Sequence, residues 1–79
     1  MLTDPLLKAS ECEVALVSPV EYDQCVVEVG HALGCLLVVS DERLDGNCVV
    51  EFPRLAHGGW RIRMDELRAL LSDAEGRLT

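Results

Sequence analysis

The sequence is poor in cations, aromatic residues and long apolar runs. It holds a single lysine, and its 7 basic residues stand against 14 acidic residues, for a net charge of −7. Because phosphate repels a surface of that sign, direct binding of nucleic acid is not expected. No apolar run approaches the roughly 20 residues that cross a bilayer, and the amino terminus lacks the regions of a signal peptide. We therefore expect a cytoplasmic protein that binds neither nucleic acid nor membrane directly.

Close cysteine pairs and phosphate-binding glycine motifs are also missing. The separations between the four cysteines are 13, 10 and 13 residues, so no single turn supplies two metal ligands: Cys12, Cys25, Cys35 and Cys48. Each falls at a core-facing position of the pattern below, which favours buried free thiols over a metal site or disulfides. The sequence "HGGW" at residues 57–60 lacks the residues of a P-loop or a dinucleotide fingerprint. Neither a metal nor a cofactor is predicted.

What the chain does have is apolar material in short segments. Apolar residues make up 49% of the 79 residues, which predicts one small domain over residues 1–79. Residues 1–10 are expected to form a short helical turn, with Asp4 as cap and Pro5 at the first helical position, or a flexible arm. Residues 77–79 are expected to be a tail.

A strand and then a helix are predicted in the first half. Residues 12–17 alternate as a strand does, with Cys12, Val14 and Leu16 facing inward. After it, "SPVE" at residues 18–21 has an N-cap serine, a proline at the first helical position and a glutamate that reaches back to the cap. This start predicts a helix that runs to Leu33 and stops at Gly34. The β-branched run "CVVEV" at residues 25–29 argues for a strand instead.

Two further strands are predicted in the middle of the chain. Residues 35–40, "CLLVVS", are apolar on both faces, as a central covered strand is. Residues 41–47, "DERLDGN", hold the Asp, Gly and Asn of a hairpin loop. Residues 47–52 then return as a strand, and Pro53 ends it.

The stretch "FPRLAHGGWRIR" at residues 52–63 combines arginines with the only tryptophan and phenylalanine. Residues 60–64 alternate strictly, so we expect them to fold back on residues 47–52. One register places Phe52 opposite Trp60, and also Val50 opposite Ile62 and Cys48 opposite Met64, all on the inward face. The same register pairs Glu51 with Arg61 outward. This basic, aromatic stretch is therefore interpreted as a hairpin.

The last element is a helix in "DELRALLSDAEG", residues 65–76, which is expected to end before Gly76. Its apolar stripe consists of Leu67, Leu70, Leu71 and Ala74, acidic residues occupy its first turn, and Gly76 follows it. The fold class is thus α+β, in the order strand, helix, strand, strand, strand, helix. The two helices are expected on one face of a four-stranded mixed sheet, whose first two strands form a parallel pair with a right-handed crossover.

No set of residues predicts catalysis. His57 is interpreted as an exposed loop residue and His31 as part of a helix's polar face. A Cys–His pair can meet in space without being close in sequence, but buried thiols are inert. Paired acidic residues occur only where solvated charges normally lie, and general acid or base catalysis needs a pocket. We therefore do not expect an enzyme.

Binding through a surface remains, and two surfaces are candidates. The first is an acidic face for a basic partner: Glu11, Glu13, Glu21, Asp23, Glu28, Asp41, Glu42 and Asp45, with Gln24 on the same helix stripe. The alternative is an open sheet face bordered by arginines: Val49, Arg61 and Arg63, with Val17, Leu36 and Val38 exposed beside them.

In general profile the chain resembles the small acidic inhibitor proteins that phages encode against host defence, including anti-CRISPR proteins. The resemblance lies in size, charge and class and involves no particular residue. It implies a protein that binds a basic, nucleic-acid-binding protein of the host and blocks it, as a monomer or a weak homodimer. The alternative is a small regulatory or effector subunit that docks on an enzyme.

Overall fold

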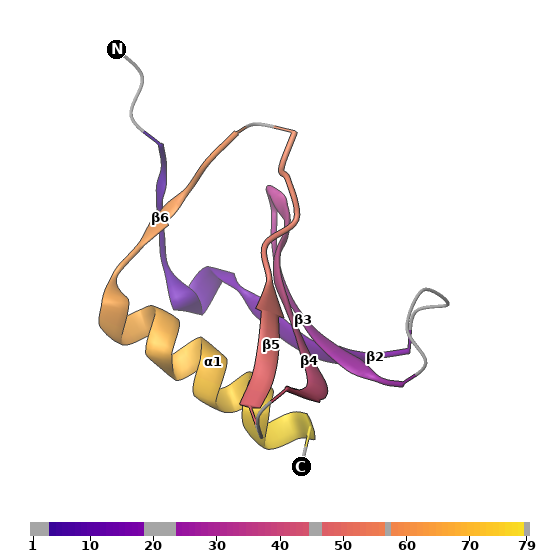
Figure 1. Cartoon of the computed structure of the whole chain (residues 1–79). Helices are drawn as coiled ribbons and strands as arrows, with labels where there is room; N and C mark the ends of the chain where they lie inside the picture. The colour runs from indigo at the N-terminus through magenta and orange to yellow at the C-terminus, as the bar shows by residue number, and fades with distance from the viewer. Residues whose placement is uncertain (1–3, 19–23, 45–46, 57, 79) are drawn as a thin grey trace.

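The computed structural model describes residues 4–18, 24–44, 47–56 and 58–78. In chain order its elements are β1 (Leu6–Leu7), a 3-10 turn (Ala9–Glu11), β2 (Glu13–Val17), β3 (Val26–His31), β4 (Gly34–Leu44), β5 (Asn47–Glu51), β6 (Arg61–Ile62) and α1 (Met64–Leu78). Figure 1 shows the curved sheet of β2 to β5 with α1 beside it and β1 next to β6. The α+β class is confirmed. Within the described ranges, no helix is long and apolar enough to cross a membrane.

The four-stranded sheet is antiparallel throughout, in the order β2-β3-β4-β5. Each strand therefore pairs with the next one along the chain. The expected mixed sheet, with a helical crossover between its first two strands, is wrong. So is the second helix, because α1 is the one α-helix in the described residues. Short connections between antiparallel strands replace the crossover that a parallel pair would need.

The predicted helix over residues 18–33 is overturned by β3. Val27 lies opposite both Leu16 of β2 and Val39 of β4, so this segment has a partner strand on each side. Its β-branched residues suit a pleated, covered surface, and Val26, Val27 and Val29 are fully buried there. A cap signal stabilises a helix start by only about 1 kcal/mol, which cannot compete with pairing on both sides. Residues 19–23, which carry most of that signal, lie outside the described residues.

The central covered strand is confirmed in β4, which is buried without interruption from Leu36 to Ser40. Opposite β3, the register shifts between Val29 and Gly30, so that Leu36 is an extra residue on β4. The expected loop over residues 41–47 is shorter than predicted, because β4 continues to Leu44 and β5 begins at Asn47. Gly34 is not a helix stop. It lies in the β3–β4 turn with a φ of +129°, a backbone conformation that residues with a side chain rarely adopt.

The last helix is confirmed as α1. Its predicted apolar stripe packs on the sheet: Leu70 and Ala74 are buried, and Leu67 and Leu71 are half-buried against the same core. The core they join contains Val27 and Val29 of β3 and Leu36, Leu37 and Val39 of β4. The helix does not stop at Gly76 but continues to Leu78, so Arg77 and Leu78 belong to it rather than to a tail.

The hairpin predicted between residues 47–52 and 60–64 does not form. β6 pairs in parallel with β1, and the backbone N–H of Arg61 donates to the carbonyl oxygen of Pro5 at 2.8 Å. Phe52 and Trp60 are nevertheless neighbours, with ring centroids 6.5 Å apart. Phe52 is 59% exposed and Met64 is 66% exposed, so the expected inward position of both is wrong. Trp60 and Ile62 do pack against the core, as their alternation predicted.

The amino-terminal segment is extended where a helical turn was expected. Leu6 and Leu7 pair with β6, and the one helical turn in this segment comes later, at Ala9–Glu11. Leu7 is buried in the core. A strand partner and an apolar contact thus replace the local cap that Asp4 and Pro5 indicated.

Candidate functional site

The face of the sheet that points away from α1 has a shallow hollow at the end where β3 turns into β4. The register pairs Glu13 with Gly30, Ala15 with Glu28 and Gly30 with Cys35, so these side chains share one face. The hollow has a volume of about 320 Å³, and we call it the acidic hollow; it is lined by Glu13, Ala15, Glu28, Gly30, His31, Gly34 and Cys35. The hollow is open because Ala15 of β2 and Gly30 of β3 have small side chains or none. Glu13 and Glu28 flank it.

The carboxylates of the acidic hollow have no counter-charge among the residues that the structure describes. Glu13 is exposed and Glu28 is half-buried. No hydrogen bond or ion pair in the described part of the chain involves either carboxylate. Ionised carboxylates only accept hydrogen bonds, so this hollow suits a group that donates several, such as an ammonium or guanidinium.

His31 closes one side of the hollow and is held in a defined orientation. Its Nδ1 accepts a hydrogen bond from the backbone N–H of Leu33 at 3.1 Å. The ring proton of the neutral imidazole is therefore on Nε2, which lies 3.9 Å from Oε1 of Glu11. Only 11% of the His31 side chain is exposed, against 56% for Glu11. Glu11 does not line the acidic hollow itself, but its carboxylate lies next to His31, which does.

The Cys35 thiol lines the hollow but is not activated. Burial raises its pKa, the nearby Glu28 carboxylate raises it further, and a backbone hydrogen bond with Leu37 acts in the opposite direction. A raised pKa keeps the sulfur protonated at neutral pH, whereas nucleophilic catalysis requires the thiolate. The geometry therefore favours binding of a cation over covalent chemistry. Among the described residues, no three His, Cys, Asp or Glu side chains are grouped closely enough to hold a metal ion.

The four cysteines are free thiols, but the expectation that they are buried is wrong. Cys25 is exposed, and Cys12, Cys35 and Cys48 are half-buried. Cys25 precedes β3, outside the strand pairing, so it lacks the covered position that the helix pattern assigned to it. Burial also raises the pKa of the Cys12 thiol, and the carboxylates of Glu11 and Glu66 add to this effect.

The structure brings together part of the predicted acidic face. Glu13 and Glu28 flank the hollow, and Glu11 lies beside His31, one of its lining residues. Asp41 and Glu42 lie on β4, where the backbone carbonyl of Asp41 accepts a hydrogen bond from Gln24 Nε2 at 2.7 Å. Glu21, Asp23 and Asp45 lie outside the described residues.

The alternative sheet-face site is not assembled as expected. Val49 is on β5 of the four-stranded sheet, whereas Arg61 opens β6 of the two-stranded sheet and Arg63 precedes α1. Leu36 and Val38, expected to be exposed beside them, are buried. These residues therefore do not form one open face.

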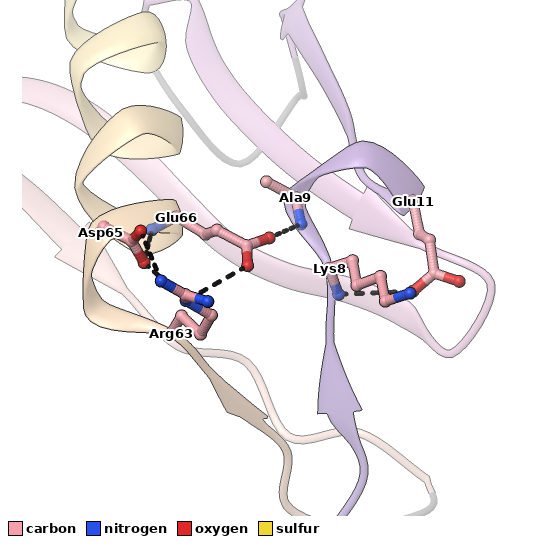
Figure 2. A network of polar contacts seen from close by, with 6 residues as sticks. All are labelled: Lys8, Ala9, Glu11, Arg63, Asp65 and Glu66. Carbon is pink, nitrogen blue, oxygen red and sulfur yellow. Dashed lines mark hydrogen bonds and ion pairs between the residues drawn. The ribbon is translucent and has the colours of Figure 1, made fainter.

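Both arginines of that alternative site are engaged within the chain. Arg61 Nε donates to the backbone carbonyl of Asp4 at 2.9 Å. Arg63 holds Asp65 with two hydrogen bonds of 3.1 Å, which lower the pKa of the Asp65 carboxyl below its usual value, and it lies 3.9 Å from Glu66. Figure 2 shows this network, in which Glu66 also accepts a hydrogen bond from the Ala9 backbone N–H at 2.6 Å.

The charges are divided along the chain. Residues 9–51 contain nine acidic residues and one basic residue, whereas residues 52–79 contain four acidic and five basic residues. All strands of the four-stranded sheet come from the first segment. The acidic hollow is therefore part of a strongly acidic sheet, and five of the seven basic residues belong to α1 and the segment that leads to it.

The sequence interpretation missed Gly30, Gly34, His31 and Cys35 as parts of this site. Gly30, His31 and Gly34 were assigned to the helix that does not form or to its expected end, and Cys35 was assigned to the core-facing side of the next strand. The signal was the repeated spacing Glu13, Ala15 and Glu28, Gly30, which places a small residue beside a glutamate on one face of two neighbouring strands. It becomes visible only once residues 26–31 are taken as a strand.

No family model matches this chain, and no match was found among curated proteins or among solved structures. The argument for function therefore depends on the geometry and the charges described above.

Proposed function

We propose that this chain is a small acidic inhibitor that binds a basic, nucleic-acid-binding surface of another protein and keeps nucleic acid from it. The observation that carries the proposal is the acidic hollow, in which two carboxylates flank a space of about 320 Å³ and have no counter-charge in the described part of the chain. An arginine or lysine side chain of the partner would occupy the hollow and hydrogen-bond to Glu13 and Glu28. The carboxylates would take the place of phosphate oxygens.

The charge distribution supports the same kind of partner. The net charge of −7 steers the chain toward positive surfaces and accelerates their association. The surplus of acidic residues lies in the segment that forms the sheet, so the side that carries the hollow approaches the partner first. Nucleic-acid-binding surfaces are strongly basic because they contact phosphate, so they are the kind of partner surface that the acidic sheet suits. The affinity of this chain for the partner should therefore fall steeply as the salt concentration is raised.

The experiment is affinity capture with three baits from a lysate of the source cells. The baits are the unchanged chain, the double variant Glu13→Gln with Glu28→Gln, and a control with Asp73→Asn and Glu75→Gln on α1, which loses the same number of charges. A protein retained by the unchanged chain and the control, but not by the first variant, is the partner. Adding the unchanged chain should then release a labelled oligonucleotide from that protein. If the oligonucleotide stays bound while the chain binds elsewhere, the proposed function is wrong.

A further inference from the structure

A second surface lies on the other side of the molecule, between α1 and the free edge of the sheet. It consists of two hollows that follow consecutive turns of α1. The first, about 650 Å³, is lined by residues 52–56 and 58–60 together with Ile62 and Leu67. The second, about 360 Å³, is lined by Val39, Asn47, Cys48 and Val50 of the sheet and by Arg68, Leu71, Ser72 and Glu75 of the helix. We call the two together the edge groove. It shares no residue with the acidic hollow.

The edge groove exists because α1 does not cover the last strand. The helix packs on β2, β3 and β4, whereas β5 lies at the end of the strand order and pairs with β4 alone among the described strands. Figure 1 shows β5 at this open edge, beside α1. The inward residues of β5 therefore meet a gap instead of the helix. Val50 is 36% exposed, and Cys48 and Leu71 are half-buried on the two sides of that gap.

An edge strand presents backbone N–H and C=O groups that another extended chain can pair with. Proteins often protect such an edge with a proline or a charge. Here Pro53 comes two residues after β5 has ended, and the strand's single charged residue is Glu51, at its last position. Next to that edge, the neighbouring rings of Phe52 and Trp60 line the first hollow. Addition of a strand provides affinity through the backbone, and neighbouring hollows select alternate side chains.

The edge groove has a net positive charge, opposite to that of the acidic hollow. Arg54 lines its first half, and Arg68 and Glu75 line its second half, so two guanidinium groups stand against one carboxylate. In the described part of the chain, neither guanidinium has a carboxylate partner, and Arg68 contacts only the sulfur of Met64, at 3.0 Å. Arg63 and Arg77, by contrast, each hold an aspartate at 3.1 Å. Two unpaired guanidinium groups beside apolar hollows favour a ligand that is both apolar and acidic.

We propose that the edge groove binds an extended peptide segment of another protein, one that alternates apolar and acidic residues. The segment adds to the sheet as a strand beside β5. Its apolar side chains fill the two hollows, and its carboxylates pair with Arg54 and Arg68. This inference does not depend on the function proposed above, because the two surfaces differ in position and in charge.

The test uses two synthetic peptides of about six residues, the usual length of a strand. One alternates valine and leucine with glutamate, and the other has lysine in place of glutamate. Binding is followed through the fluorescence of Trp60, the only tryptophan, and through amide hydrogen exchange in β5. The glutamate peptide should change the fluorescence in a saturable manner and slow exchange at Asn47–Glu51, and the lysine peptide should not bind there.

Variants of the arginines complete the test. Arg54→Glu combined with Arg68→Glu should weaken binding of the glutamate peptide at least tenfold, since two favourable charge pairs become unfavourable. Arg77→Glu, a control on α1 outside the groove, should leave it within about twofold. Circular dichroism checks that each variant remains folded. The proposal is overturned if the glutamate peptide does not slow exchange in β5, if the lysine peptide binds there equally well, or if the double arginine variant binds as the unchanged chain does.

Discussion

The two faces of the four-stranded sheet are built from alternate residues of the same strands, yet they differ in almost every property. Under α1, Val27 and Val29 of β3 and Leu37 and Val39 of β4 are buried together. On the other face of the same strands, Glu28 and Gly30 help to line an open acidic hollow. Neighbouring residues in one strand therefore serve different purposes: one set stabilises the fold, and the other is available for a partner.

The outer face is itself divided. Val26, Val38 and Ser40 are buried on it, with exposed fractions of 0%, 6% and 4%. The hollow lies toward the opposite end of β3, next to the turn into β4. The region free to bind a partner is therefore small and local, and its shape depends on the turn at Gly34.

Truncation of a residue under α1 should have the largest effect on stability. Leu37→Ala removes a fully buried side chain from the centre of the core, so the free energy of unfolding should fall by about 2–5 kcal/mol. Urea denaturation followed by circular dichroism measures this loss. Leu16→Ala, at a position that is 51% exposed, is the control and should cost no more than about 1 kcal/mol. Equal losses at the two positions would mean that the core does not lie under α1.

Substitution of the turn glycine should cause the next largest loss of stability. Gly34→Ala places a side chain at a φ of +129° and brings its Cβ within 3.2 Å of Leu55 Cδ2. The expected loss is about 1–3 kcal/mol of unfolding free energy, again from urea denaturation. Gly76→Ala is the matched control. It lies in α1 with no atom within 4 Å of the added Cβ, so it should stabilise the protein by about 0.5–1 kcal/mol. If Gly34→Ala also stabilises, the turn geometry described here is incorrect.

Loss of the contact between the amino-terminal segment and α1 should cost somewhat less. Glu66→Ala removes the acceptor for the Ala9 N–H and a neighbour of Arg63, so the unfolding free energy should fall by about 1–2 kcal/mol. Amide exchange at Ala9 should become faster as well. Asp73→Ala, which removes only an exposed pair with Arg77, is expected to cost at most about 0.5 kcal/mol. An unchanged exchange rate at Ala9 would show that Glu66 does not hold this segment.

The smallest effect concerns the thiol in the acidic hollow. At about pH 8 the exposed Cys25 should react with a thiol reagent first, and Cys35 should react slowly because burial and Glu28 raise its pKa. Glu28→Gln should lower the pKa of Cys35, increase its thiolate fraction and accelerate its labelling, as resolved by mass spectrometry of the peptides. Labelling of Cys25 in the same sample is the internal control. A rate at Cys35 that does not respond to Glu28→Gln would place the carboxylate away from the hollow.

Elements with an unambiguous local pattern could be predicted from the sequence. The apolar stripe of α1 and the two-sided apolar run in β4 each have one structural interpretation, and both were predicted correctly. Residues 26–31 were not, because "SPVE" is a strong helix start and the valines that follow fit either a helix face or a strand. Pairing with β2 and β4 decided between them, and local sequence does not contain that information.

The candidate site was predicted in part for the same reason. Glu13 and Glu28 were identified from charge alone, but their relation to Gly30, His31 and Cys35 depends on the β2–β3 register. The predicted hairpin between residues 47–52 and 60–64 was wrong for a different reason. Its internal pairing was consistent, but β1 offered β6 another partner 55 residues away, Leu6 opposite Arg61. Only a three-dimensional structure reveals such competition between partners.

The most direct test of the account is the affinity of the captured basic partner for three forms of the chain, measured by titration calorimetry at low and at physiological salt. The forms are the unchanged chain, the Glu13→Gln and Glu28→Gln double variant, and the charge-matched Asp73→Asn and Glu75→Gln control. The account predicts that the double variant binds at least tenfold more weakly, which corresponds to about 1.4 kcal/mol, and that the difference narrows as salt is raised. The control should bind as the unchanged chain does. Equal weakening in the two double variants would contradict the account, because net charge, and not the acidic hollow, would then determine binding.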